Sequence, residues 1–148
     1  MLVTRNKIGV NRSAHIVILG SGFAGVEVLK KLQKEYRNDD SKEIIMISRD
    51  NFLLFTPMLP EVATGTVDTR HIVTPIRSFC KKATFYEATV QSIDLKNKKI
   101  VATHEIGKSN LSTDTRQHIL SYDYLVIAVG SENNFFGVDE IGSKMHLK

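Results

Sequence analysis

The stretch IVILGSGFAGVEVLKKL, residues 16–32, decides the fold of this chain. Its first four residues, Ile16 to Leu19, are apolar and rich in branched side chains, which predicts a short buried strand. Apolar residues then return every three or four positions, at Val26, Leu29 and Leu32, as they do along one face of a helix. The glycine-rich segment between these two patterns predicts a tight turn from strand to helix.

A second strand is expected after that helix. The polar cluster at 37–41 is expected to end the helix, and the apolar run at 44–47 predicts the next strand. A strand, a helix and a strand within about 30 residues form a βαβ unit, whose two strands run parallel. The predicted fold class is therefore α/β, a Rossmann-like domain with a parallel central sheet.

The middle of the chain is expected to be less regular. Residues 51–65 are apolar, but two prolines interrupt them, which favours an ordered loop over a long helix or a central strand. Helical spacing of apolar residues over 72–79 predicts a helical segment. We expect Pro75 to begin a helical turn there and Thr74 to cap it.

A small antiparallel β-meander is predicted at about 83–120. Residues 84–95 and 99–106 alternate between apolar and polar side chains, like two strands joined by a turn. Residues 107–117 predict a polar loop. The run at 122–130 predicts a last apolar strand that ends on a glycine.

The composition fits one soluble domain in a reducing compartment. The chain has 148 residues, 42% of them apolar, and a formal net charge of +4. Its lysines form short groups without interleaved aromatic residues, so nucleic-acid binding is not expected. Cys80 is the only cysteine, so no structural disulfide is expected within the chain. The histidines lack the spacing of metal ligands, and no apolar run reaches the ~20 residues that cross a bilayer.

The three glycines of the turn suit a dinucleotide site. Gly20 permits the sharp turn out of the strand, Gly22 lets a pyrophosphate approach the backbone, and Gly25 lets the helix pack closely on the strand. The pyrophosphate would then lie at the N-terminus of the helix, where free N–H groups favour an anion. Because the motif follows a strand and opens a helix inside a βαβ unit, we predict dinucleotide binding rather than a purely structural turn.

The position that usually carries a ribose-binding carboxylate departs from this pattern. The second strand ends Ile47-Ser48-Arg49-Asp50, with Ser48 where the acid is expected. Ser48 can still hydrogen-bond a ribose hydroxyl, although without a charge. Arg49 either stacks on adenine or contacts a phosphate, or it is a solvated surface residue, and Asp50 is a candidate cap for the turn. The sequence leaves both interpretations of Arg49 open.

Five segments, in order along the chain, resemble the N-terminal third of the type II (alternative) NADH:quinone oxidoreductases, flavoproteins with two dinucleotide-binding domains. The segments are ILGSGFAG, SRDNFLLFTPMLPEVATGTVD, TPIRSF, YEATVQSID and YDYLVIAVGSENNFFG. FTPMLPEVATGTVD is far more specific than the glycine motif. The resemblance predicts a partial FAD-binding domain at 15–138, between an N-terminal extension at 1–14 and a tail at 139–148 that leads to an NADH-binding domain.

In that family the first glycine motif holds FAD, so the resemblance implies a set of cofactor-binding residues. They are Gly20, Gly22, Phe23 and Ala24 along the pyrophosphate with Gly25 behind them, Ser48 and Arg49 near the adenosine, Val90 at the adenine through its backbone, Thr56 and Pro57 near the isoalloxazine, and Ala128, Val129 and Gly130 at the border of the flavin. No catalytic side chain is assigned. Glu61 and Asp68 are expected to be solvated or to cap turns rather than to supply protons to a quinone.

The resemblance also implies an activity, in which NADH gives a hydride to FAD and the flavin reduces a membrane quinone. Disulfide reductases of the superfamily carry a cysteine pair after the second strand, whereas 51–65 contains none, which favours a quinone acceptor. The 148-residue chain by itself is expected to be inactive, because the family's second glycine motif for NADH is not within it. The expected location is cytoplasmic and peripheral to the inner face of the membrane.

Two alternatives stay open on the sequence. One is another flavoprotein reductase of the superfamily, such as a sulfide:quinone oxidoreductase. The other is a non-enzymatic nucleotide-binding module that forms a homodimer through an exposed strand edge.

Overall fold

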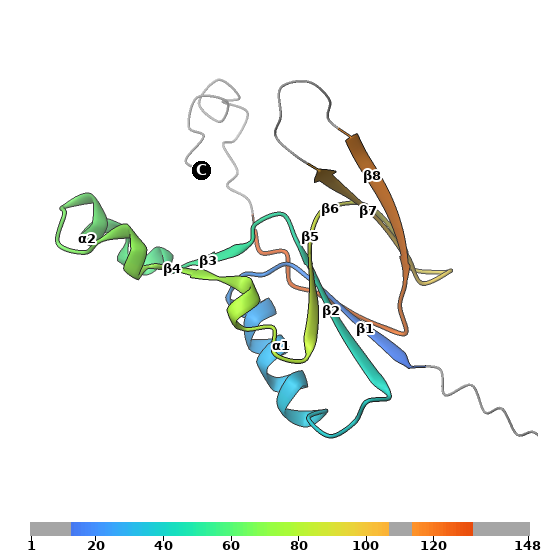
Figure 1. Cartoon of the computed structure of the whole chain (residues 1–148). Helices are drawn as coiled ribbons and strands as arrows, with labels where there is room; N and C mark the ends of the chain where they lie inside the picture. Colours follow the sequence, from blue (N-terminus) through green and yellow to red (C-terminus); the bar gives the residue numbers. More distant parts are fainter. Residues whose placement is uncertain (1–12, 107–113, 132–148) are drawn as a thin grey trace, which may run out of the picture.

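The computed structural model describes residues 13–106 and 114–131. Their centre is a four-stranded parallel sheet in the order β5-β2-β1-β9. Its strands are β1 (Ala14–Leu19), β2 (Lys42–Ser48), β5 (Ala83–Glu87) and β9 (Tyr124–Ile127). Helix α1 (Phe23–Glu35) lies on one face of this sheet, and three antiparallel strands lie on the other (Figure 1). The predicted βαβ unit is confirmed, because α1 connects β1 to a parallel β2.

The central strand β1 is apolar on both faces because both faces are covered. Ile18 belongs to a cluster on the α1 side, where it joins Val26 and Leu29 of the helix. Val17 and Leu19 belong to a second cluster on the opposite face. All five side chains are at most 1% exposed. This burial on two faces explains why β1 is a continuous apolar run rather than an alternating one.

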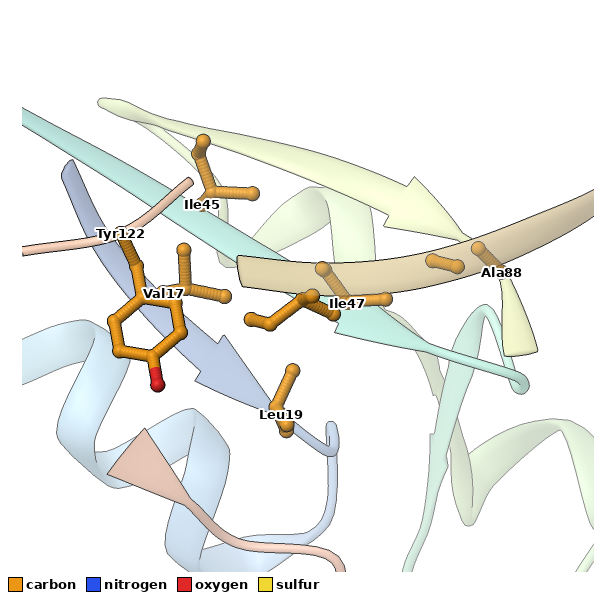
Figure 2. Close-up of a cluster of buried hydrophobic side chains, with 8 residues drawn as sticks. Val17, Leu19, Ile45, Ile47, Ala88 and Tyr122 are labelled. Atoms are coloured by element: carbon orange, nitrogen blue, oxygen red, sulfur yellow. The ribbon is translucent and has the colours of Figure 1, made fainter. Parts of the chain in front are cut away.

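The antiparallel layer consists of β6 (Thr89–Asp94), β7 (Lys99–Ile106) and β8 (Asp114–Ser121), in the order β6-β7-β8. Ile100 and Ala102 of β7 are buried in the cluster that contains Val17 and Leu19. Figure 2 shows part of this cluster, with the ring of Tyr122 beside Val17. The antiparallel layer therefore covers the face of the parallel sheet that α1 leaves open.

The single strand predicted at 84–95 is wrong in one respect, because the segment divides between the two sheets. β5 pairs in parallel with β2, whereas β6 pairs antiparallel with β7. The change of sheet occurs at Ala88, which is buried and whose N–H donates to the Ser48 carbonyl at 2.9 Å. The antiparallel layer thus begins at Thr89 rather than at 83. Alternation of side chains continues through this corner, so the sequence pattern does not reveal it.

The polar loop predicted at 107–117 is wrong for 114–117, which form the start of β8. β8 is an edge strand of its sheet, and an edge strand tolerates a polar sequence such as DTRQ. Residues 107–113 lie outside the described part of the chain. The last strand is confirmed but is shorter than the predicted 122–130, because β9 ends at Ile127.

The segment between β2 and β5 forms an arm that extends away from the sheet (Figure 1). It contains β3 (Phe52–Leu54), the 3₁₀ turn η1 (Thr56–Met58), α2 (Leu59–Ala63), the 3₁₀ turn η2 (Thr69–His71), β4 (Val73–Pro75) and the 3₁₀ turn η3 (Ile76–Ser78). The prediction of no long helix or central strand at 51–65 is confirmed, although short elements replace the expected loop. Pro60 is compatible with α2 because it lies in the first turn, where a helix needs no N–H from it.

The helical segment predicted over 72–79 is confirmed only as the 3₁₀ turn η3, and its extent and its Thr74 cap are wrong. Thr74 lies in β4, which pairs with β3, and does not cap a helix. Pro75 precedes η3 as its N-cap residue, and only the three residues of that 3₁₀ turn are helical. Ile72 and Ile76 are both buried, so a strand followed by a turn produces the same apolar spacing as a helix.

The predicted extension at 1–14 and tail at 139–148 are outside the described residues, apart from positions 13 and 14. Ala14 already belongs to β1, so the first strand begins one residue earlier than the domain predicted to start at 15. Residues 132–138 of the predicted domain are also outside the described part.

The packing between the two sheets predicts that two isoleucines on neighbouring strands contribute differently to the free energy of unfolding. Ile100 of β7 is fully buried, so Ile100→Ala should lower the free energy of unfolding by about 2–5 kcal/mol. Ile119 of β8 is 67% exposed, so Ile119→Ala should change it by less than about 0.5 kcal/mol. Urea unfolding followed by circular dichroism measures both. Equal losses in the two variants would contradict the described packing.

Candidate nucleotide-binding site

The candidate site lies at the carboxyl ends of three parallel strands. Leu19 at the end of β1 is in register with Ile47 of β2 on one side and with Ile127 of β9 on the other. The chain leaves β1 through α1 to reach β2, whereas β9 returns on the opposite side of β1. The strand order therefore reverses at β1, and ligands of open α/β sheets bind outside the carboxyl ends of strands at such a reversal.

Gly20 makes the turn out of β1 and has two reasons to be glycine. Its φ is +96°, a left-handed conformation that residues with a side chain rarely adopt. A Cβ atom at this position would lie 2.3 Å from the carbonyl oxygen of Ala128. Its N–H donates to the Ile47 carbonyl at 2.8 Å, and the Ala128 N–H donates to the Leu19 carbonyl at 2.8 Å. The turn is therefore fixed to the strands on both sides of β1.

Gly25 allows α1 to pack on this turn. A Cβ atom at Gly25 would lie 2.0 Å from the carbonyl oxygen of Gly20, a distance that real Cβ atoms do not show. The first turn of α1 therefore rests directly on the backbone of the turn that precedes it. This contact confirms the close helix packing that the third glycine of the motif predicts.

Gly22 differs from the other two glycines, because neither its backbone conformation nor its packing within the protein requires a glycine. Its φ of −70° and ψ of −173° are accessible to any residue. A Cβ atom there would meet no atom of the protein within 4 Å. The absence of a side chain at Gly22 instead leaves open space at the N-terminus of α1, as the approach of a ligand to the backbone requires.

The N-terminus of α1 has the electrostatic properties of an anion site. Gly22 is its N-cap residue and provides no side-chain cap, and the first turn contains no acidic residue. The first N–H groups of a helix have no partner within the helix, and the helix dipole places partial positive charge there. The residues present therefore fit a pyrophosphate group at this end of α1.

Serine side chains link the glycine turn to the end of β2. Ser21 is buried, and its hydroxyl donates to the Ser48 hydroxyl at 2.8 Å. The carbonyl oxygen of Asp50 lies 3.2 Å from the Ser21 hydroxyl, so Asp50 takes part through its backbone. Arg49 is exposed. The sequence analysis identified Ser48 and Arg49 but missed Ser21, whose only signal is a hydroxyl between two glycines.

A carboxylate lies on the strand beside Ser48. Glu87 at the end of β5 is in register with Ser48, and its Oε2 accepts a hydrogen bond from Asn51 Nδ2 at 3.1 Å. The position of Glu87 depends on the pairing of β5 with β2, which the sequence analysis did not predict.

Phe23 connects the glycine motif to the arm. Its ring packs edge-to-face against that of Phe55, with 5.9 Å between the centroids, and both side chains are nearly half exposed. Phe55 immediately precedes η1, so this contact holds Thr56 and Pro57 near the first turn of α1. Ala24, in that first turn, is exposed.

Of the remaining predicted residues, Ala128, Val129 and Gly130 border the same edge of the sheet, whereas Val90 does not. Ala128 and Val129 are the backbone neighbours of Gly20, and Val129 is largely exposed. Gly130 has a φ of +76°, which favours glycine. Val90 is half buried on β6 and packs against the cluster of Val17 and Leu19, on the face of the sheet opposite α1. Val90 is therefore the predicted residue that lies apart from the glycine turn.

Other reactive groups of the described chain do not belong to this site. Cys80 is half buried beside α1, next to Phe79, whose carbonyl accepts a hydrogen bond from Gln33. Gln33 lies about 15 Å along the helix from Phe23. Burial raises the pKa of the Cys80 thiol, which is therefore protonated at neutral pH. Hydrogen bonds from Arg70 lower the pKa of Asp68 to about 2, and Asp68 caps η2, as predicted.

Neither a metal centre nor a membrane span is found in the parts of the chain that the structure describes. Within 13–106 and 114–131, no three histidine, cysteine or acidic side chains are grouped as a metal ion would need. Over the same residues, no helix has the length and apolar character to cross a membrane.

Comparison with known proteins shows that this chain belongs to a described family. Residues 14–148 match the sequence profile of the family described as pyridine nucleotide-disulphide oxidoreductase. External alternative NAD(P)H-ubiquinone oxidoreductase B3, a mitochondrial protein of Arabidopsis thaliana, is 37% identical over 140 residues, which are 92% of this chain and 23% of that protein.

Two solved structures are similar in fold. NDH2 from Plasmodium falciparum in complex with NADH has a TM-score of 0.68 and 27% identity, over 85% of this chain and 24% of that one. The sulfide:quinone oxidoreductase of Aquifex aeolicus has a TM-score of 0.63 and 25% identity, over 82% of this chain and 25% of that one. The chain thus spans about a quarter of the length of the proteins it matches.

The different surroundings of Gly22 and Gly25 predict that the same substitution costs different amounts of stability at the two positions. Gly25→Ala places a methyl group against the Gly20 backbone and should lower the free energy of unfolding by about 1–3 kcal/mol. Gly22→Ala adds the same methyl group in open space, so it should lower that free energy by less than about 1 kcal/mol, the cost of alanine as a poorer N-cap. Urea denaturation distinguishes them. A Gly22→Ala variant as unstable as Gly25→Ala would show that Gly22 is also needed for internal packing.

Proposed function

Because this chain belongs to the pyridine nucleotide-disulphide oxidoreductase family, we propose that it forms the FAD-binding part of a type II NAD(P)H:quinone oxidoreductase. The observation that carries the proposal is the open space at Gly22. An uncapped helix N-terminus faces this space, and the turn before it is held by Gly20 and Gly25. A phosphate anion fits such a place, and a side chain would fill it.

The arrangement of the other residues supports a cofactor that extends from β2 to β9. Its adenosine end would lie near Ser48 and Arg49, and its pyrophosphate would lie against the turn from Gly20 to Gly22. The flavin end would lie between Thr56 and Pro57 of the arm and the segment from Ala128 to Gly130. When bound, FAD supplies the ring that takes up a hydride and passes electrons on, while the protein supplies binding and orientation.

A quinone is the acceptor that the described chemistry favours. A disulfide reductase needs a thiolate beside the flavin. No cysteine lies in 51–65, and Cys80 is protonated and located beside the far half of α1. The relatives of this chain include proteins named for NAD(P)H and ubiquinone. We therefore propose NAD(P)H as the hydride donor and a membrane quinone as the acceptor.

The proposed enzyme works at the surface of a membrane, because its acceptor is dissolved in the bilayer. The Arabidopsis relative is named as an external mitochondrial protein. The cytoplasmic, inner-face location expected from the sequence stays a prediction, as does the expectation that this chain alone is inactive with NADH.

The homodimer alternative stays a prediction, and the strand through which it would form is β9, at the edge of the parallel sheet. Its side chains Tyr124 and Ile127 are more than half exposed, and a strand edge can pair with a second copy. Size-exclusion chromatography with light scattering at two concentrations, with and without FAD, distinguishes the alternatives. A colourless dimer that binds neither FAD nor ADP would favour the self-associating module.

The proposal predicts that ADP and FAD bind at the same place and depend on Gly22. Gly22→Val should weaken ADP binding by roughly 10–100-fold, because its side chain excludes phosphate from charge-assisted hydrogen bonds worth about 1.5–3 kcal/mol. Isothermal titration calorimetry measures the affinity of each nucleotide for the full 148-residue chain.

The control for this test is Ser92→Val, which places the same valine side chain at an exposed position of β6 on the antiparallel layer. Its affinities should equal those of the unchanged chain, and urea unfolding should show that both variants fold. Unchanged ADP and FAD affinities in a folded Gly22→Val variant would overturn the proposal.

A further inference from the structure

We infer that Ser21 is a positioning residue, which directs the Ser48 hydroxyl toward the ribose of the bound adenosine nucleotide. This inference rests on the proposed function. In other dinucleotide-binding sites, a carboxylate at the end of the second strand hydrogen-bonds the ribose. Here we assign that role to two uncharged hydroxyl groups.

Ser21 has an unusual environment for a serine in a turn. It is the buried polar side chain within the described residues, at 5% exposure. Burying a hydroxyl costs free energy unless it forms a hydrogen bond, and Ser21 meets this condition through Ser48 and the Asp50 carbonyl. Both partners lie at the carboxyl end of β2 or directly after it. The side chain thus connects the phosphate-binding turn to the predicted ribose position.

The geometry leaves one donor available for a ligand. A serine hydroxyl has one hydrogen and two lone pairs. The single hydrogen of Ser21 lies between the Ser48 oxygen at 2.8 Å and the Asp50 carbonyl oxygen at 3.2 Å, and the nearer Ser48 oxygen is its main acceptor. Because Ser48 accepts in this contact, its own hydrogen can be donated to another group. Ser48 is half buried at the carboxyl edge of the sheet, where a nucleotide on the N-terminus of α1 would pass. Ser21 therefore orients a donor rather than supplying one.

A purely structural role accounts for only one part of this arrangement, the contact of Ser21 with the Asp50 carbonyl. The turn is already attached to β2 by the hydrogen bond from the Gly20 N–H to the Ile47 carbonyl at 2.8 Å. Alanine at position 21 would fill most of the same volume without a hydroxyl to satisfy. The contact between the Ser21 and Ser48 hydroxyls has a function if Ser21 orients the Ser48 hydroxyl toward a ligand.

Glu87 is the competing group for the same ribose. It lies beside Ser48 in the sheet and presents a carboxylate, which also accepts hydrogen bonds from hydroxyl groups. Its Oε2 is already bonded to Asn51 Nδ2 at 3.1 Å. We assign the ribose to Ser48 because Ser48 is next to the glycine turn, whereas Glu87 lies one strand farther away.

The test compares ADP with 2′,3′-dideoxy-ADP, which keeps the adenine and the pyrophosphate but lacks both ribose hydroxyls. Calorimetry gives the ratio of the two affinities for the full chain and for the variants Ser21→Ala, Ser48→Ala and Glu87→Gln. The unchanged chain should prefer ADP by about two- to tenfold, as expected for one neutral hydrogen bond. Both serine variants should lose this preference, Ser21→Thr should keep it, and Glu87→Gln should keep it.

The ratio separates positioning from folding, because a loss of stability weakens both ligands equally. A preference for ADP that survives in Ser21→Ala and Ser48→Ala, or that disappears in Glu87→Gln, would overturn the inference while the proposed function stands. If the unchanged chain binds neither nucleotide, the proposed function fails, and this inference fails with it.

Discussion

The structure depends on one steric constraint, the contact between Gly25 of α1 and the carbonyl group of Gly20. The helix can lie this close to the turn because no Cβ atom separates them. The contact fixes where α1 begins, and therefore where its free N–H groups are placed. On the other side of the turn, Gly20 lies against the Ala128 carbonyl of the segment after β9, where a Cβ atom would come within 2.3 Å of the oxygen. The turn, the start of α1 and the distant segment at Ala128 thus meet without side chains between them, which leaves backbone as the surface offered to a ligand.

The elements with a strong periodic signal could be predicted from the sequence. β1, α1 and β2 were predictable because burial on two faces makes a strand continuously apolar, whereas burial on one side gives a helix its apolar stripe. The elements that were missed lie where burial is one-sided or slight. β8 is a polar edge strand, and β4 with η3 buries Ile72 and Ile76 at a spacing that a helix would also produce. Local patterns do not distinguish these cases, because the neighbours that decide them are distant in the chain.

The candidate site was predictable to the extent that it depends on local backbone geometry. The roles of Gly20 and Gly25 follow from the turn itself, and the structure gives each the contact that its role requires. Ser21 could not be recognised, because its importance arises from Ser48, 27 residues later. The place of Glu87 depends on β5 joining the parallel sheet, and the sequence analysis assigned that strand to the meander.

The position of β1 between β2 and β9 also has a consequence for how the chain folds during synthesis. The partner of β1 on one side arrives with the βαβ unit, but the hydrogen bond from the His15 N–H to the Asp123 side chain spans 108 residues. A ribosome that adds about 5–20 residues per second needs roughly 5–20 s to make this interval. During that time the middle strand of the nascent sheet has one unpaired, apolar edge. During this interval another strand can pair wrongly with the open edge of β1. The interval ends when β9 emerges from the ribosome and pairs with that edge.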